Sequence, residues 1–502
     1  MLIVKYIALI LIFIFLGSLL IHGLDSINQD IGRHLKSGQI IWETKSVYKT
    51  NLFSFTEPNH PFINHHWLSE VIFYLLNNLI GLKGLVIFKT GIILSAFSFI
   101  FLSVHKKVEN WAFLASMFLA LFVFIGRTDV RPEIFSYLFL SFFLFAILRA
   151  KYSEIYKYLY ILPVVQIFWV NMHIYFALGP MLLFFFLIDR RFYDKNKKIF
   201  KKILLIFTAT IISNLINPNF IKGAIIPFTI LKQYSYSIVE NQSVFFLKNY
   251  GVFLKEINLF ALSLFVLTIS FAVAFKNGRK NFLFEVLTAI TFLILAMSMV
   301  RNFAIYAIAF IPIVAFNFNA VKKHLMFDTA KARTLFYVLF SLIMPWLTMA
   351  VVNNNFYLWL ESPKKFGLTI SEGAEKGIQF IKQNKIPGPV FNNFDVGSFL
   401  IWKLYPEQKV FVDGRPEAYS MGFFEKIYKP MQENPAMWKK YSEEYKINYI
   451  FFDRHDITPW ARSFLDQIPK NPDWPLIYLD ESAAIFLERT PENKKIIDEF
   501  EI

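Results

Sequence analysis

The stretch YIALILIFIFLGSLLIHGLDSINQDIGRHLKSG, residues 6–38, decides what kind of fold this chain has. Its first part, Tyr6–Ile21, is uncharged and almost wholly apolar, as in a helix that crosses a membrane. No small-residue cleavage pattern follows it, so we expect a retained span and not a signal peptide. Residues 28–38 then bring an Asp, an Arg, a His and a Lys together. A charged segment therefore follows the point where the chain leaves its first apolar run.

The composition of the whole chain predicts an α-helical polytopic membrane protein. The chain has 502 residues, of which 56% are hydrophobic and 19% aromatic, and it has no cysteine. Its mean hydropathy is +0.45, which is too high for a soluble protein of this size. We expect about eleven transmembrane helices, at Tyr6–Ile21, Leu85–Val104, Trp111–Gly126, Ile134–Leu148, Leu159–Val170, Ile174–Ile188, Ile203–Leu215, Asn258–Phe275, Phe284–Val300, Phe303–Phe318 and Leu335–Val352. A further apolar run, Trp67–Ile80, ends at Gly81 and predicts a half-span or an interfacial helix.

The distribution of basic residues predicts the orientation of these spans. One set of connecting loops carries 19 Lys and Arg residues and the opposite set, although longer, carries 11. Because basic loops stay in the cytoplasm, we place the N-terminus inside and the C-terminus outside a bacterial inner (plasma) membrane. The net charge of +15 is then mainly a topology signal. It gives no reason to expect nucleic acid as a partner.

The chain changes character near residue 353. We predict a transmembrane domain at 1–352, with a first outer loop at 22–70, and a soluble extracytoplasmic α/β domain at 353–502. Helices are expected at Gly397–Leu404 and within Gly422–Tyr445, between strands that should pair in parallel, while the last two strands should form a hairpin. The expected strands are Val390–Asn393, Val410–Asp413, Tyr449–Asp453, Leu476–Leu479 and Ala484–Leu487.

The first outer loop holds the densest group of chemically active side chains. Helical spacing over Leu24–Ser37 puts Asp30, Arg33, His34 and Ser37 on one face, and predicts an amphipathic helix on the membrane that ends at Gly38. Further along lie His65, His66, Trp67 and Glu70. Their spacing matches no strong metal motif, and two adjacent histidines on a helix would point apart. We expect substrate contact or hydrogen bonding there.

Polar groups also gather at the outer ends of the spans. The simplest explanation is that they cap helices or reach the membrane surface. However, placing Asp, Glu, His or Asn near lipid costs free energy. Their gathering on one side predicts a polar cavity open to the exterior. In the C-terminal domain, Asp413 and Arg415 follow a predicted strand and are either substrate contacts or a salt bridge. The outer-end residues are Arg127, Asp129, Arg131, Glu133, Trp169, Asn171, His173, Arg301 and Asn302.

These motifs resemble the GT-C superfamily of membrane glycosyltransferases, which includes protein O-mannosyltransferases, lipid A aminoarabinose transferases and the catalytic subunit of oligosaccharyltransferase. The likeness rests on Asp30, Arg33, His34 and Gly38 after the first span. It also rests on FSFTEPNHPFINHHWLSE (53–70), RPE (131–133), WVNMH (169–173), NPN (217–219), RN (301–302) and VFVDGRPE (410–417). The sequence is most similar to uncharacterised bacterial GT-C-like proteins. Asp25 and Asp30 lie too far apart for the paired carboxylates of many members.

The resemblance implies a sugar transfer at the outer face of the membrane, with inversion at the anomeric carbon, from a polyprenyl-phosphate-linked donor to a glycan, lipid or protein acceptor. It makes Asp30 or Asp25 the general base, with Asp129 and Glu133 as a second acidic motif. Arginines would balance the leaving phosphate and the tryptophans would stack on a sugar. A divalent ion, Mg or Mn, is left open as a cofactor.

The sequence also permits other functions. A transporter or flippase of lipid-linked saccharides would have a similar composition, but transporters commonly show repeated halves, and no internal repeat is found here. Ligase- or polymerase-type enzymes usually carry their large outer domain as an internal loop. A non-catalytic GT-C relative that serves envelope glycan assembly is the third alternative.

Overall fold

The structure is a computed structural model that describes residues 2–25, 30–194, 196–234, 236, 238–319, 330–371 and 373–502. The chain folds into two compact units, each built from separated segments. The first unit contains residues 1–23, 83–224 and 237–369, and the second contains 24–82, 225–236 and 370–502. The second unit therefore combines the first outer loop with the C-terminal region. The predicted domain boundary at 352/353 stays a prediction, although the last long apolar helix does end at Val352.

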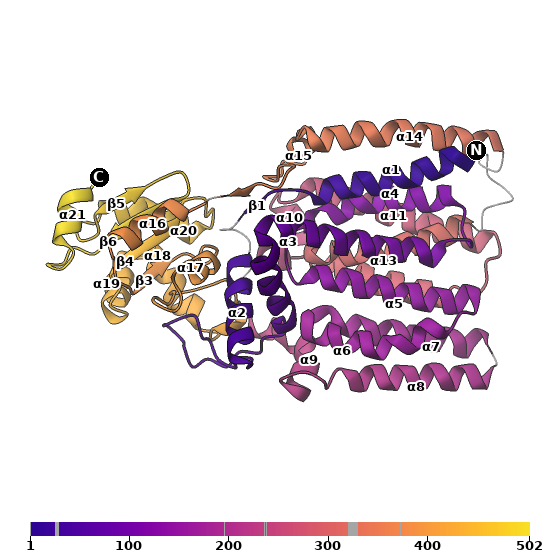
Figure 1. Cartoon of the computed structure of the whole chain (residues 1–502), viewed down its shortest axis with the longest axis horizontal. Helices are drawn as coiled ribbons and strands as arrows, with labels where there is room; N and C mark the ends of the chain where they lie inside the picture. The colour runs from indigo at the N-terminus through magenta and orange to yellow at the C-terminus, as the bar shows by residue number, and fades with distance from the viewer. Residues whose placement is uncertain are drawn as a thin grey trace. The chain divides into compact units, whose positions relative to one another are not determined.

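The first unit is a bundle of apolar helices, and each of the eleven predicted spans falls on a helix (Figure 1). Seven described helices are long and apolar enough to cross a membrane, by length and composition. The helices that carry the other predicted spans have 11 to 17 residues. The bundle helices are α1 (Leu2–Leu20), the end of α3 (Trp67–Val104), α4 (Asn110–Phe124), α5 (Glu133–Ser153), α6 (Leu162–Met172), α7 (Leu178–Tyr193), α8 (Lys197–Ser213), α11 (Leu254–Lys276), α12 (Leu283–Ser298), α13 (Phe303–Asn319) and α14 (Ala330–Val352).

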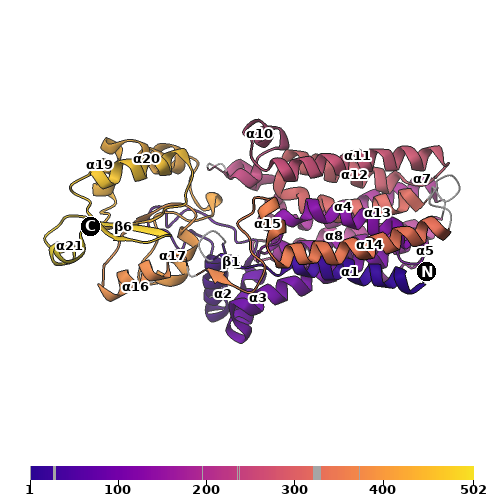
Figure 2. The ribbon, with the colours of Figure 1, turned by 90° about the horizontal axis from the view of Figure 1, so that it is seen from above.

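Packing within the bundle follows the apolar pattern of each helix. The central helix α13 is apolar on every side and almost fully buried, and it packs against α4, α11 and α12. Helix α14 lies along α1, as both views show (Figures 1 and 2), and exposes Leu335, Leu342 and Trp346 on its other side. A helix that is apolar all round belongs in the interior, and one with a bare apolar face belongs at the lipid boundary.

The second unit is built around a four-stranded sheet with the order β3-β4-β6-β5 (Figure 1). Strands β3 and β4 pair in parallel, whereas β4 and β5 each pair antiparallel with β6. This confirms the predicted parallel pair and hairpin. The elements are β1 (Leu24–Asp25), α2 (Ile31–Thr44), the start of α3, β2 (Ile370–Ser371), α16 (Glu375–Gln383), β3 (Val390–Asn392), α17 (Gly397–Leu404), α18 (Lys429–Glu433), α19 (Pro435–Glu444), β4 (Tyr449–Asp453), α20 (Pro459–Gln467), β5 (Leu476–Leu479), β6 (Ala483–Leu487) and α21 (Lys494–Phe500).

Three short helices complete the set of described α-helices: α9 (Phe220–Thr229), α10 (Val244–Asn249) and α15 (Asn355–Trp359). The prediction of a strand at Val410–Asp413 was wrong. Val410 forms only an isolated bridge with Ser54 of the first outer loop. The rest of the segment makes single hydrogen bonds with side chains. Ser54 and Thr56, for example, both donate to the carbonyl of Phe411. A chain segment held by side chains forms no ladder.

The helix of the first outer loop differs from its prediction at both ends. Leu24–Asp25 forms the short strand β1, residues 26–29, which include Ile27, lie outside the described residues, and α2 begins at Ile31 and continues past Gly38 to Thr44. Gly38 does not end the helix but allows a close contact. A Cβ on Gly38 would lie 2.1 Å from the carbonyl oxygen of Glu70 in α3. The face of α2 that carries Arg33, His34 and Ser37 is buried in the second unit and is not solvated, while Glu43 near the end of the helix is exposed.

Helix α3 changes direction at Gly81, which has a φ of 67° and a ψ of −179°. A positive φ is open to glycine at little cost, so this residue interrupts the helix. The break falls where the sequence predicts the end of a short interfacial helix at Trp67–Ile80. The N-terminal part of α3 belongs to the second unit and the C-terminal part to the first.

Candidate functional site

The side chains at the start of α2 form a connected group, which we call the Asp30 cluster: Asp30, Arg33, His34, Asn64 and Glu70. Asp30 is the N-cap residue of α2, but its carboxylate makes no capping bond. Instead, its Oδ1 accepts a hydrogen bond from the Ser398 hydroxyl (3.2 Å), and it lies 3.8 Å from Nη2 of Arg33. The Asp30 side chain is 31% exposed. It is therefore a carboxylate with both an accessible face and a cationic neighbour.

Behind Asp30, the cluster is buried and closed by hydrogen bonds. Glu70 has no exposed surface; its Oε1 lies 2.8 Å from Nδ1 of His34 and 3.5 Å from Nη1 of Arg33, and its Oε2 accepts from Asn64 (2.6 Å). Burial, followed by the charge of Arg33, lowers the pKa of His34. A neutral His34 donates its Nδ1 proton to Glu70, and Glu70 in turn balances Arg33. This arrangement fixes Arg33 next to Asp30.

Helical spacing predicted Asp30, Arg33 and His34 on one face, and in the structure these side chains are neighbours. The sequence placed Glu70 further along the loop and did not predict that it joins them from α3. The adjacent residues His65 and His66 do not point apart. They lie in a turn before α3, and their ring centroids are 3.8 Å from each other. Trp67 begins α3 and is partly buried. Asp25 lies in β1, and its side chain is outside the described part of the structure.

The predicted pair Asp413 and Arg415 forms a buried ion pair in the same unit. Nε and Nη2 of Arg415 donate to the two carboxylate oxygens of Asp413, each at 2.7 Å, and Nη2 also donates to Asn51 (2.8 Å). The guanidinium lies over Phe62, 4.7 Å from the ring centroid. With exposures of 0% and 1%, this pair joins the first outer loop to the C-terminal segment. Of the two explanations that the sequence left open, these contacts favour the salt bridge.

Asp129 lies in a different group, in the first unit. It pairs with Lys364 (3.1 Å) and lies 3.9 Å from Nε2 of His22. His22 also contacts Thr128 (3.0 Å) and Lys89 (3.3 Å), and Lys89 donates to the carbonyl of Leu20. Burial raises the pKa of Asp129, but the charges of Lys364 and its other basic neighbours outweigh this and hold the pKa far below its usual range. Asp129 is therefore a stable anion.

Three arginines form another group in the first unit, which we call the arginine cluster: Arg127, Arg131 and Arg301, with Glu133 and Glu240. Arg127 pairs with Glu133 (2.8 Å) and Glu240 (2.5 Å), and Arg131 with Glu240 (3.1 Å). Nη1 of Arg301 donates to Asn241 (2.9 Å), next to Glu240. The sequence predicted the arginines and Glu133. It missed Glu240, because a single Glu in a long loop has no distinguishing pattern.

The remaining outer-end residues support the backbone. The indole of Trp169 is fully buried and donates to Ser136 (2.8 Å), which also contacts His173 (2.9 Å). Asn171 donates to the carbonyls of Ile167 and Ile216. Asn302 donates to the carbonyl of Leu295 and accepts from Tyr175. Their contact with a sugar stays a prediction.

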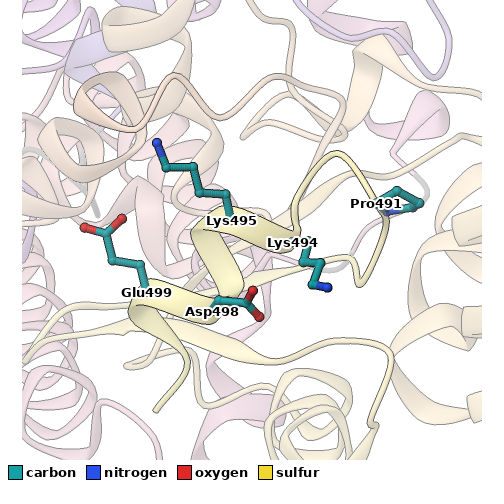
Figure 3. Close-up of a pocket in the computed structure, with 5 residues that line it drawn as sticks. All are labelled: Pro491, Lys494, Lys495, Asp498 and Glu499. Atoms are coloured by element: carbon teal, nitrogen blue, oxygen red, sulfur yellow. The ribbon is translucent and has the colours of Figure 1, made fainter.

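In the described parts of the chain, no group of three or more His, Asp or Glu side chains is arranged to hold a metal ion. A divalent cation as cofactor stays a prediction. A shallow hollow lies along α21, lined by Pro491, Lys494, Lys495, Asp498 and Glu499 (Figure 3). None of these is a candidate site residue.

The helical bundle and the mixed sheet with its added outer loop share their fold with solved structures of an archaeal oligosaccharyltransferase and of ArnT, in agreement with the predicted GT-C-like fold class. Oligosaccharyltransferase AglB of Archaeoglobus fulgidus, tethered with an acceptor peptide, has a similar structure with a TM-score of 0.58 and 11% identity, over 98% of this chain and 74% of that one. The same enzyme with an inhibitory peptide and a dolichol-phosphate gives 0.56 and 11%, over 97% and 75%.

A second similar protein has nearly the same length. ArnT from Cupriavidus metallidurans in the apo state has a TM-score of 0.54 and 10% identity, over 96% of this chain and 97% of that one. No protein-family profile and no curated protein matches the sequence. The fold is thus shared over almost the full chain, while the sequences have diverged widely.

Proposed function

We propose that this protein is a glycosyltransferase that moves a sugar from a polyprenyl-phosphate-linked donor to an acceptor at the outer face of a bacterial plasma membrane. The observation that carries the proposal is the environment of Asp30, a partly exposed carboxylate whose Oδ1 has both the Ser398 hydroxyl and the fixed Arg33 as neighbours. The GT-C fold adds support, because solved structures that share it are sugar transferases.

In this proposal Asp30 is the general base. Its carboxylate takes the proton of the acceptor hydroxyl, the acceptor oxygen bonds to the anomeric carbon, and the bond from that carbon to the phosphate breaks with its electron pair on the phosphate. Arg33, in the same unit as Asp30, is the candidate to stabilise the negative charge of the departing phosphate. Inversion at the anomeric carbon follows from a single displacement.

The experiment is a transfer assay on membranes that contain the protein, with radiolabelled polyprenyl-phosphate sugars as donors. Asp30→Asn keeps the size and hydrogen bonding of the side chain but removes the base, and we expect a loss of about 10²- to 10⁴-fold. Asp129→Asn tests the second acidic motif. Glu361→Gln is the control, because this side chain is 79% exposed and pairs only with Lys255. Full transfer by Asp30→Asn would rule out the mechanism and favour a non-catalytic role.

A further inference from the structure

The arginine cluster gathers more positive charge than its own carboxylates balance. Arg127 and Arg131 belong to the one connection between α4 and α5, Arg301 lies in the turn Val300–Asn302, and all three act on the carboxylate of Glu240. Oε2 of Glu240 accepts from both Arg127 and Arg131. Three guanidinium groups thus meet around one carboxylate, with Glu133 as the second anion. Bidentate donors at this density are the arrangement that proteins use to hold phosphate.

The two carboxylates of the cluster are held very differently. Glu133 lies in the first turn of α5, and its side chain is 2% exposed. Glu240 lies in the single 3-10 turn Val239–Asn241, and its side chain is 32% exposed. Glu133 is therefore part of the packed bundle. Glu240 belongs to a surface turn that can move away without breaking a helix.

The positive charges of the three arginines remain when Glu240 moves away, so the group that replaces Glu240 must be an anion. Burial raises the pKa of Glu240, but Arg127, Arg131 and Arg301 outweigh this and hold the pKa well below its usual range. Protonation therefore does not release Glu240 at physiological pH. Without Glu240 the cluster keeps three guanidinium groups and the carboxylate of Glu133, while Asp129 also acts on Arg131. The cluster therefore keeps an excess of positive charge, which suits a phosphate. Nε of Arg127, a residue that is only 7% exposed, also has no hydrogen-bond partner.

We propose that the arginine cluster is a phosphate-binding site and that Glu240 is an internal anion that occupies it until a phosphate group displaces it. The inference deepens the proposed function, on which it rests for the identity of the ligand as the phosphate of a lipid carrier. The site closes on its own carboxylate when empty, so the arginines are never left unbalanced. Phosphate binding then includes the cost of moving Glu240, which weakens it.

The experiment measures phosphate binding to the purified protein in detergent by titration calorimetry, with inorganic phosphate and farnesyl phosphate as probes. Glu240→Gln removes the competing charge at nearly constant size, and we expect both probes, or farnesyl phosphate alone, to bind about tenfold tighter. Glu240→Asp, which keeps the charge on a shorter side chain, should bind with intermediate strength and serves if Glu240→Gln fails to fold. Unchanged or weaker binding by these variants would overturn the proposal.

Two further variants test whether the phosphate binds at the arginine cluster and whether its binding is independent of Asp30. Arg131→Gln in the Glu240→Gln background should abolish the gain, and a gain that persists would show that the phosphate binds elsewhere. Asp30→Asn should bind phosphate as the wild type does, whether or not it still transfers sugar. Tighter binding of farnesyl phosphate than of inorganic phosphate supports a lipid-borne ligand. Equal binding supports the same site with free phosphate as its ligand, and counts against the lipid carrier.

Discussion

Nδ1 of His34 and Oε1 of Glu70 lie 2.8 Å apart in the interior of the second unit and join α2 to the start of α3. Both side chains are buried, so their charge and hydrogen-bonding needs must be met inside the protein. The carboxylate of Glu70 supplies a negative charge for Arg33 and accepts hydrogen bonds from His34 and Asn64. The reactivity that we assign to Asp30 depends on this buried arrangement, since it keeps Arg33 in place.

Removing the charge of Glu70 should therefore destabilise the protein strongly. Glu70→Gln leaves the buried guanidinium of Arg33 with only weaker anionic neighbours among the described residues, Asp30 and Glu417, and we expect a loss of about 3 kcal/mol in the free energy of unfolding. Thermal unfolding in detergent measures it. Glu43→Gln, on the exposed side of the same helix, should change stability by less than about 0.5 kcal/mol. Equal effects of the two variants would contradict the role of Glu70.

Gly38 should not tolerate a side chain. In Gly38→Ala the new Cβ meets the carbonyl oxygen of Glu70 at 2.1 Å, so α2 and α3 must separate. We expect destabilisation of about 2 kcal/mol and a large fall in sugar transfer, because Asp30 moves with α2. Gly17→Ala in α1 is the matched control: its Cβ meets open space, and alanine favours a helix by up to about 1 kcal/mol. Normal stability of Gly38→Ala would show that the two helices pack less closely.

The stability of the first unit should fall as the pH falls below about 6.5, partly through His22. Burial, followed by the charges of Lys364 and Lys89, lowers the pKa of His22 to about 3, against the opposing pull of Asp129. Between pH 6.5 and 3 the unfolded chain thus binds a proton that the folded protein refuses, and folding loses stability as the pH decreases. We expect a loss of about 2 kcal/mol from pH 7 to pH 5.

The measurement for His22 is the free energy of unfolding against pH in wild type and His22→Gln. Glutamine keeps a hydrogen bond to Thr128 but has no titrating group, so its curve should be flatter by that amount. His455→Gln, at a position where the side chain is 63% exposed, should leave the wild-type slope unchanged. Parallel curves for His22→Gln and wild type would exclude His22 as a source of the pH dependence.

The orientation of the chain can be tested independently of catalysis. Alkaline phosphatase fused after Ile502 should be active, since it folds only after export, and a green fluorescent protein at the same position should be dark. The same reporters at the N-terminus should give the opposite pattern. The expectation rests on the excess of basic residues in one set of loops. A cytoplasmic C-terminus would reverse the side on which every candidate residue lies.

The fold was largely predictable because the sequence patterns of its bundle helices and of its sheet strands are both strong. Uniformly apolar runs located the eleven bundle helices, and short apolar runs bounded by turn residues located β3, β4, β5 and β6. The failures have a common cause. The helix expected to start at Leu24 starts at Ile31, and the strand expected at Val410 is absent, because partners remote in sequence, Ile370 for Leu24 and Ser54 for Val410, decide the local structure.

The candidate site was predictable where helical spacing sets it and not where tertiary contacts do. Spacing within α2 brought Asp30, Arg33 and His34 to one face. Nothing in the sequence indicated that Glu240 would meet Arg127, or that Lys364 would meet Asp129. Those pairs join residues more than 100 positions apart, and a charged residue in a loop has the same pattern whether it is solvated or paired.

The second unit is discontinuous, and this has a consequence for synthesis. Strand β1 pairs with β2, and α2 packs against α17, although roughly 300 residues separate the end of the first outer loop from Ile370. At about 5 to 20 residues per second, a ribosome needs on the order of 15 to 60 s to make them. During that interval the loop waits with Arg33, His34 and Glu70 lacking the segment that covers them. Nascent chains stalled before residue 370 should accordingly be good substrates for envelope proteases and holding chaperones.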